Sequence, residues 1–246
     1  MKKYFFILVV TISAFSNCFG QTKKTLSSTE FKQEIQQAIN QMNQENIVLK
    51  FKKETFQDLK SATPVESVNG VIYKESGFVY KMLAGGITVL QTKDYAIYID
   101  TAQHFVQVSD IDPSMKAMSM ANELTQEMLD RYDLEKTSFG GYTVLKAIPK
   151  ISDEGTMEFY IDTKRKVLYK LVITLPSANY FMESEDDETI ESPYITVVYE
   201  PITPLKKNEV SFSDEKILVK DKQNNITLAP GMIAYQLHDA RLKSKK

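Results

Sequence analysis

The chain has 246 residues, of which 43% are apolar, and its net charge at pH 7 is −2. A mildly acidic chain without basic stripes argues against nucleic acid as the main partner. The single cysteine, Cys18, lies in the N-terminal leader. The mature chain is therefore expected to have no disulfide, no catalytic thiol and no cysteine-bound zinc ion.

The first 20 residues are predicted to be a secretory signal peptide. A basic start and an apolar stretch from Tyr4 to Ile12 precede small and polar residues up to Gly20, after which we expect cleavage. Residues 21–246 would then form one mature domain in the periplasm. A form anchored to lipid through Cys18 is the alternative. No second apolar stretch approaches membrane length, which favours a mature protein outside the membrane.

An amphipathic helix is predicted near the start of the mature chain. Ser27 and Glu30 have the spacing of a capping box, and the helix is expected to end near Asn43. The residues that fall on its apolar face are Phe31, Ile35, Ala38, Ile39 and Met42.

Residues 46–108 are predicted to form about six short antiparallel strands. Apolar and other residues alternate with a period of two, and glycine and aspartate breaks separate the runs. One face of such a sheet is apolar and needs a cover. The nature of that cover decides what the protein can bind.

A second helix is predicted to begin at Asp112, a favoured N-cap, with Pro113 in its first turn, and to run to about Arg131–Leu134. Ala117, Ala121, Leu124, Met128 and Tyr132 line one side, and Met115, Met118 and Met120 add unbranched bulk. Methionine suits a surface that must fit varied apolar shapes, but it also fills ordinary cores. A movable lid over an apolar cavity and simple core packing therefore both stay open.

Further strands are predicted after this helix, at Tyr142–Ile148, Met157–Ile161, Val167–Leu175 and Tyr194–Tyr199. The predicted fold class is mainly β with α. We expect one strongly curved antiparallel sheet, an unclosed β-barrel, covered on its concave side by the N-terminal helix and a lid helix.

The sequence has no catalytic signature: it contains no G-x-S-x-G, no H-E-x-x-H and no glycine-rich phosphate loop. His104 and His238 are expected to be turn or surface residues. The acidic run Glu183–Glu188 lacks the glycine and the spacing of a calcium loop, and we expect a solvated hairpin tip. No enzyme activity, metal site or cofactor is predicted. A hydrolase with Ser or Asp beside one histidine is an alternative.

Short motifs recur along the stretch Ile47–Val108 and in a late strand expected at Val210–Ser213. Those in the stretch are Phe51, Asn69–Tyr73, Phe78–Tyr80, Val89–Asp94, Tyr98–Asp100 and Val106–Val108. On these motifs the chain resembles the LolA-like carriers of outer-membrane lipoproteins. Val79 stands where that family commonly has Arg, and Lys53 replaces a Gln. The residues from about 221 exceed the typical length of the family and are expected to add a strand that ends at Asp239–Arg241.

The resemblance implies a periplasmic carrier that holds lipoprotein acyl chains or lipid beneath a helical lid, and that exchanges them with membrane-bound donor and acceptor proteins. The expected lining is Leu49, Phe51, Tyr73, Phe78, Tyr80, Met82 and Tyr98 on the sheet, with Met115, Met118, Leu124 and Met128 on the lid. The alternative is a non-catalytic envelope binding or assembly protein with the same fold and a filled core. A cavity of several hundred Å³ beneath the lid would favour the carrier.

Overall fold

The computed structural model describes residues 23–76, 79–111, 124–151, 154–176, 192–223 and 225–241. The strands are β1 (Lys24–Thr25), β2 (Ile47–Phe56), β3 (Glu66–Lys74), β4 (Tyr80–Ala84), β5 (Ile87–Gln91), β6 (Ala96–Asp100), β7 (Phe105–Ser109), β8 (Tyr132–Phe139), β9 (Tyr142–Pro149), β10 (Thr156–Asp162), β11 (Val167–Thr174), β12 (Tyr194–Tyr199), β13 (Thr203–Pro204), β14 (Leu218–Lys220), β15 (Ile226–Leu228) and β16 (Gln236–Asp239). The helical segments are α2 (Ser28–Asn40), η1 (Gln41–Asn43), α4 (Gln126–Leu129) and η3 (Pro230–Met232).

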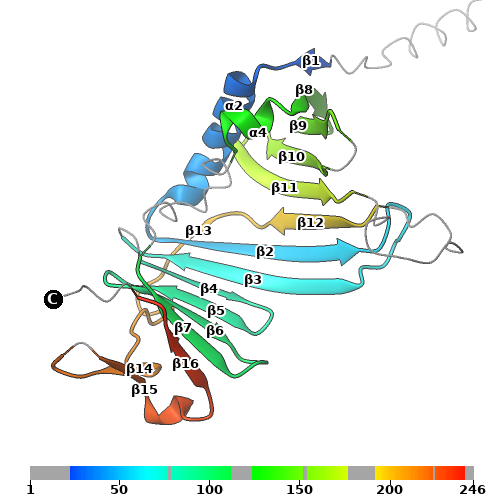
Figure 1. The fold of residues 1–246 in the computed structure, drawn as a ribbon. Helices are drawn as coiled ribbons and strands as arrows, with labels where there is room; N and C mark the ends of the chain where they lie inside the picture. Colours follow the sequence, from blue (N-terminus) through cyan, green and yellow to red (C-terminus); the bar gives the residue numbers. More distant parts are fainter. Residues whose placement is uncertain are drawn as a thin grey trace, which may run out of the picture.

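One large curved sheet dominates the fold (Figure 1). It has 14 strands in the order β1-β8-β9-β10-β11-β12-β2-β3-β4-β5-β6-β7-β16, with β13 added beside β2. All neighbours in it are antiparallel except β16 and β7. The sheet does not close on itself, which confirms the predicted fold class. Among the described residues, no helix is both long and apolar enough to cross a membrane.

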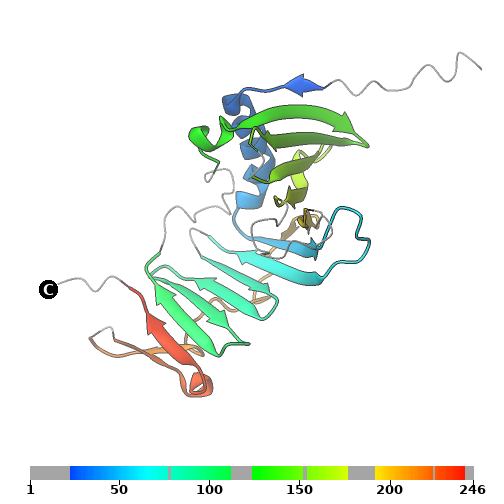
Figure 2. The same ribbon diagram turned by 45° about the vertical axis from the view of Figure 1, so that its right-hand side comes forward.

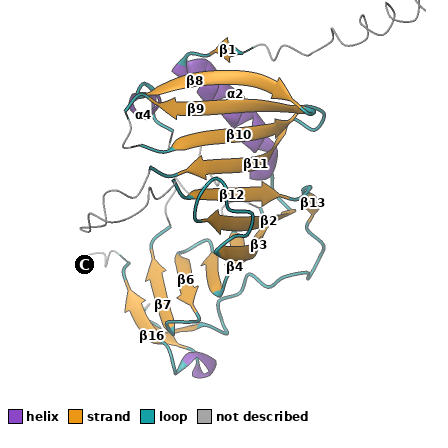
Figure 3. Ribbon diagram, turned by 90° about the vertical axis from the view of Figure 1, so that its right-hand side faces the viewer, coloured by secondary structure: helices purple, strands orange, loops and turns teal. Residues whose placement is uncertain are grey.

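The helix α2 forms as its sequence predicts. The Ser27 hydroxyl accepts a hydrogen bond from the Glu30 amide at 3.2 Å, and the Glu30 carboxylate accepts one from the Ser27 amide at 2.9 Å. The helix ends at Asn40, and the single turn η1 continues to the predicted end at Asn43. In Figure 3, α2 lies across strands β8 to β11 on one side of the sheet.

A filled core lies between α2 and the sheet. We call the side of the sheet that α2 covers the α2 face, and the opposite side the outer face. Phe31 and Ile35 of α2 pack against Phe159, Leu145 and Leu171 of the sheet, and all five side chains are buried. The rings of Phe31 and Phe159 meet edge to face, with centroids 6.0 Å apart. The interior beneath α2 is therefore occupied by the protein's own side chains.

A second core lies on the outer face of β5–β7. The segment 205–235 crosses this face and contributes Leu218 and Ile226, which pack with Leu90 and Ile97 of the sheet. The chain then returns as β16, which pairs with β7 in parallel (Figure 2). This confirms the predicted extra strand near Asp239–Arg241.

Polar contacts fasten this C-terminal segment to the sheet. The Tyr95 hydroxyl donates a hydrogen bond to the Asp214 carboxylate, and the Lys220 ammonium lies 4.2 Å from the centre of the Tyr95 ring. The Lys81 ammonium donates to the Ser211 carbonyl at 3.3 Å. The segment is therefore an integral part of the fold.

Two predicted elements are wrong. The second helix does not reach Arg131–Leu134, because α4 ends at Leu129 and Tyr132–Phe139 form strand β8. Tyr132 and Leu134 fit a helix end and a strand start equally well, and pairing with β9 decides for the strand. No strand forms at Val210–Ser213, since Phe212 packs on the second core from an irregular segment. The predicted start of the helix, at Asp112, lies outside the described residues.

Candidate functional site

Strand pairing fixes which of the predicted lining residues share a face. Leu49 pairs with Ile72, Ile72 with Met82, Met82 with Val89 and Val89 with Tyr98. Partners in an antiparallel sheet present their side chains on the same side. Leu49 is buried in the core beneath α2, so this whole row lies on the α2 face.

Two more of the predicted residues join this face. Phe51 lies two residues along β2 from Leu49, and its ring sits over Gly70, where an added Cβ would lie 2.1 Å from the ring. Only a residue without a side chain leaves room for Phe51 there. Tyr80 pairs with Lys74, whose ammonium donates to the Met42 carbonyl of η1 at 3.2 Å, so Tyr80 also lies on the α2 face.

Tyr73 lies on the outer face, and its predicted place among the lining residues is wrong. It pairs with Val48 and Lys81, one residue out of step with the row of Leu49. In Val71–Lys74, odd-numbered and even-numbered positions both carry apolar residues, so the alternation alone does not show which side chains are buried. The pairing of Ile72 with Leu49 shows that the even-numbered positions lie on the α2 face. Three other predicted lining residues, Phe78, Met115 and Met118, lie outside the described residues.

Burial divides the remaining predicted residues, of which Tyr98 is exposed at 37% and the others are sealed or partly buried. Leu49 and Leu124 are sealed inside the α2 core and have no surface left for a ligand. Others stay only partly buried at the edge of that core. Six of the partly buried residues that pack on this core form what we call the apolar track: Phe51, Met82, Met128, Met157, Ile173 and Val197.

Three members of the track were missed by sequence reasoning. Met157, Ile173 and Val197 alternate within predicted strands, but that alternation does not reveal their neighbours. The pairing of β12 with β2, which places Val197 opposite Lys53, brings them beside Phe51. This pairing joins segments about 140 residues apart, and no local pattern encodes it.

The apolar track opens toward one end of the strands. Along β11, every second residue points to the α2 face, and exposure rises from 2% at Leu171 through the partly buried Ile173 to 37% at Leu175. A continuous apolar surface therefore runs from the sealed core to the edge of the sheet.

Polar side chains border the track on both sides. Lys74 is only 8% exposed, and burial lowers the pKa of its ammonium although nearby Glu45 raises it. Burial also disfavours the charged form of the neighbouring Tyr80 and therefore raises the pKa of its hydroxyl group. Near the open end, Glu66 accepts hydrogen bonds from Thr55 at 3.1 Å and from Lys53 at 3.3 Å, and these two bonds lower its pKa. The apolar surface is therefore a strip with polar margins.

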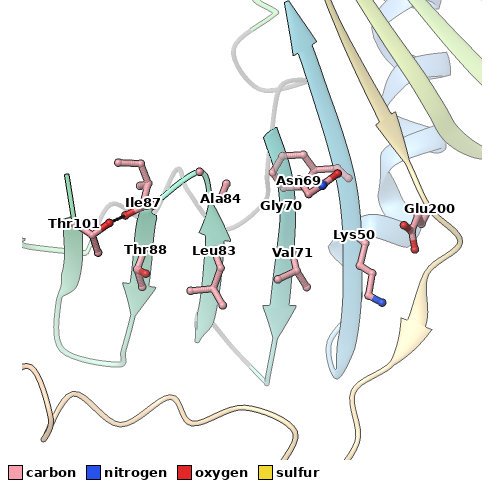
Figure 4. A pocket seen from close by; sticks show the side chains of 13 residues that line it. Lys50, Asn69, Gly70, Val71, Leu83, Ala84, Ile87, Thr88, Thr101 and Glu200 are labelled. Carbon is pink, nitrogen blue, oxygen red and sulfur yellow. Dashed lines mark hydrogen bonds between the residues drawn. The ribbon is translucent and has the colours of Figure 1, made fainter. Parts of the chain in front are cut away.

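The described residues also form a shallow pocket, and residues from both faces of the sheet line it. Its volume is about 490 Å³. Its floor comes from adjoining positions of β2–β5, including Val71 and Leu83, with Lys50 and Glu200 at one side (Figure 4). Of the predicted lining residues, Phe51 alone contributes to it. Its lining residues Phe51, Gly70, Ala84 and Ile87 form one row on the α2 face, so the pocket borders the apolar track at Phe51.

Each of the two histidines lies beside an aromatic ring. The His104 ring lies 5.2 Å from the Tyr235 ring, and the His238 ring 6.4 Å from the Phe105 ring. Within the described ranges, neither imidazole is hydrogen-bonded to a Ser or Asp side chain. Nor do these ranges contain a cluster of three His, Cys, Asp or Glu side chains that could hold a metal ion. The acidic run Glu183–Glu188 lies outside them.

No protein-family model matches this chain, and no curated protein matches it in sequence. Several solved structures are similar in fold. The MucA/MucB complex from Pseudomonas aeruginosa is 10% identical with a TM-score of 0.37, over 74% of this chain and 59% of that chain. LprF from Mycobacterium bovis is 10% identical with a TM-score of 0.34, over 76% and 97%.

A LolA superfamily protein from Nitrosomonas europaea is 8% identical with a TM-score of 0.28, over 74% of this chain and 94% of that chain. The family expected from the sequence is therefore represented among the similar structures. Scores this low carry no information about function, which has to come from the residues themselves.

Proposed function

We propose that this chain is a non-catalytic envelope protein that binds the acyl chain of a lipid or lipoprotein along the apolar track and carries it toward the outer membrane. The supporting observation is the partial burial of the track beside a sealed core. An acyl chain laid along Phe51, Ile173 and Val197 would remove their remaining apolar surface from water. Each methylene buried in this way contributes about 0.8 kcal/mol.

The chemistry of the track suits a ligand of variable shape. Met82, Met128 and Met157 are unbranched and flexible, so they can adapt to chains of different length or unsaturation. Phe51, held against Gly70, is the rigid element among them. A track of this kind discriminates by apolarity rather than by exact shape.

A second candidate function rests on the filled interior beneath α2. A carrier of the expected type needs room beneath its helices, whereas Phe31, Ile35 and Phe159 fill that space here. An assembly or binding protein with the same fold would use the apolar track to contact a protein segment. The two candidates therefore differ in the ligand of the apolar track, which is an acyl chain for the carrier and a protein segment for the assembly protein.

Mass spectrometry of lipids extracted from gently purified, exported protein separates the two candidates. The carrier predicts acyl-bearing species in near-stoichiometric amounts, either at once or after labelled lipoprotein is offered. The Met82→Glu variant should lose most of this lipid while its thermal unfolding stays cooperative. Lipid no higher than background for the unaltered protein in both settings would favour the assembly protein.

A further inference from the structure

Exposed apolar side chains gather at one end of the sheet. Leu59 and Val65, in the connection between β2 and β3, are 61% and 66% exposed. Ile151, between β9 and β10, is 56% exposed, and Leu175 follows directly after β11. Half of the eight large apolar side chains that are exposed in the described part of the chain belong to this group. We call these four residues the apolar rim.

Strand pairing shows that the rim residues share one end. Phe56 at the end of β2 pairs with Tyr194 at the start of β12, and Tyr194 pairs with Thr174 at the end of β11. Thr174 in turn pairs with Thr156, the first residue of β10. The connections that carry the rim residues therefore all leave the sheet at the same end of its strands.

The rim is continuous with the apolar track. Leu175 follows Ile173 at the spacing of one strand face, and its amide still donates to the Pro193 carbonyl at 2.8 Å, so the chain stays extended there. An acyl chain that entered over Leu175 would reach Ile173 and then Val197 without leaving apolar surface.

The connection that carries Leu59 is held in a fixed shape. The Asp58 carboxylate accepts hydrogen bonds from the Lys60 amide at 2.8 Å and the Ser61 amide at 2.7 Å. The bonds from Ser61 and Lys60 also lower the pKa of Asp58. Leu59 is thus displayed outward by a turn that needs little ordering when it meets a partner.

The residues behind the rim suit the boundary between water and lipid. The rings of Phe56 and Tyr194 stack with centroids 4.5 Å apart, and aromatic rings are enriched at such boundaries. Among the described residues near the rim, Lys53 pairs with Glu66 and Arg131 pairs with Glu154. Paired charges of both signs fit a zwitterionic surface better than an anionic one, which would attract unpaired lysines.

We propose that the apolar rim is a docking surface for a zwitterionic lipid bilayer, oriented so that the open end of the apolar track faces the membrane. This proposal rests on the proposed acyl-chain function. A docked rim would give an acyl chain a route from the bilayer to the apolar track that does not cross water. A few exposed side chains give weak and reversible contact, as repeated loading and release require.

The absence of tryptophan from the sequence allows a clean test. The Leu59→Trp variant places the only indole on the rim. The matched control is Phe139→Trp, since Phe139 is 62% exposed but lies in the β8–β9 hairpin, where its pairing through Tyr142 to Asp162 places it at the other strand end. Each variant is mixed with phosphatidylcholine vesicles, with and without brominated acyl chains.

The proposal predicts that emission of Leu59→Trp shifts to the blue and is quenched at least twofold by brominated lipid, while Phe139→Trp is unchanged. Adding Val65→Glu to Leu59→Trp should abolish the shift. An unchanged Leu59→Trp spectrum, or equal changes at both positions, would overturn the proposal. A shift that requires added envelope proteins and does not occur with vesicles alone would also overturn it, in favour of a protein partner.

Binding of a soluble fatty acid, below its micelle concentration, separates this proposal from the proposed function. Val65→Glu should bind that fatty acid within twofold of the unaltered protein. If vesicle docking is absent while fatty acid binding persists, the rim proposal fails and the acyl-chain function stands. If docking occurs but no fatty acid binds, the acyl-chain function fails instead, and the rim is a membrane contact with another purpose.

Discussion

The two cores of this protein lie on opposite faces of one sheet. Near α2, the buried side chains belong to the α2 face, and the outer face of β8–β12 carries charged pairs such as Lys146 with Glu158. At β5–β7 the outer face is buried instead, while Tyr98 on the α2 face is 37% exposed. The buried side therefore changes along a continuous meander, and strand alternation alone cannot tell which side is the core.

The covers of the two cores also differ in kind. The α2 core is closed by a helix with a local capping signal, formed by Ser27 and Glu30. The second core is closed by irregular chain and the short hairpin β14–β15, and side-chain contacts such as that of Tyr95 with Asp214 fasten this cover to the sheet. A helix of several turns can be recognised from its own sequence, whereas a cover of this kind is defined mainly by what it packs against.

Removal of residues 205–246 is expected to have the largest effect, because it uncovers the whole second core. The loss of burial at Leu90, Ile97 and their neighbours should exceed the 5–15 kcal/mol by which domains are typically stable. Soluble yield and hydrogen exchange in β5–β7 provide the measurement, with removal of residues 242–246 as the control. Native protection of β5–β7 in the long truncation would show that the second core is dispensable.

Truncation of single core side chains tests whether the cores are comparable. Phe159→Ala should lower the free energy of unfolding by about 3–5 kcal/mol, and Ile97→Ala by about 2–5 kcal/mol. The cores share no side chain, so the double variant should be additive within about 0.5 kcal/mol. Urea unfolding measures all three variants. Strong non-additivity would mean that the two faces are coupled through the sheet.

Gly70→Ala should have a smaller but more specific effect. The added Cβ would meet the Phe51 ring at 2.1 Å, so the ring must move along the α2 face. We expect a loss of about 1–3 kcal/mol in the free energy of unfolding. Fatty acid affinity should fall as well, because Phe51 belongs to the apolar track. Combining the change with Phe51→Leu should recover part of the stability, and no recovery would point to backbone strain at residue 70.

The smallest expected effect concerns the cap of α2. Hydrogen bonds from Ser27 and Lys24 lower the pKa of Glu30 from its ordinary 4.5 to about 2. Between pH 2 and pH 4.5, the Glu30 carboxyl group therefore binds a proton more readily in the unfolded chain than in the folded protein. The contribution of Glu30 to stability is complete above pH 4.5 and is lost as the pH falls toward 2.

Glu30→Gln should therefore reduce the acid dependence of unfolding over that range. Chemical denaturation at several pH values between 2 and 6 provides the measurement. Glu209, an exposed carboxylate outside the capping box, provides the control through Glu209→Gln. Identical pH profiles for Glu30→Gln and the unaltered protein would show that the capping box adds nothing to the stability of the α2 core.

The features predicted correctly from sequence are local ones. The capping box of α2 and the alternation in β2 follow from spacings of a few residues, and the structure has both. Leu49, Phe51 and Met82 share one face of the sheet, as the alternation of β2 and the pairing of β3 with β4 require.

The features that sequence could not supply depend on distant pairing. Tyr73 was placed on the wrong face because Val71–Lys74 is apolar at both parities, and only its register with β2 decides. Sequence reasoning missed Val197 because β12 pairs with β2, a strand far away in the sequence. Phe212 lies in irregular chain and Leu218 in a strand of three residues, which is too short to show a period, so nothing in the segment 205–235 identified it as the cover of a second core.

The most direct test of the account compares two adjacent valines on β12. Val197 belongs to the apolar track, whereas Val198 lies on the outer face between Lys52 and Lys170, where a carboxylate would find opposite charges. Binding of a fluorescent fatty acid is measured for Val197→Glu and Val198→Glu after both are shown to fold. The account predicts that Val197→Glu weakens binding at least tenfold and Val198→Glu by less than twofold. Equal affinities, or no binding by the unaltered protein, would contradict it.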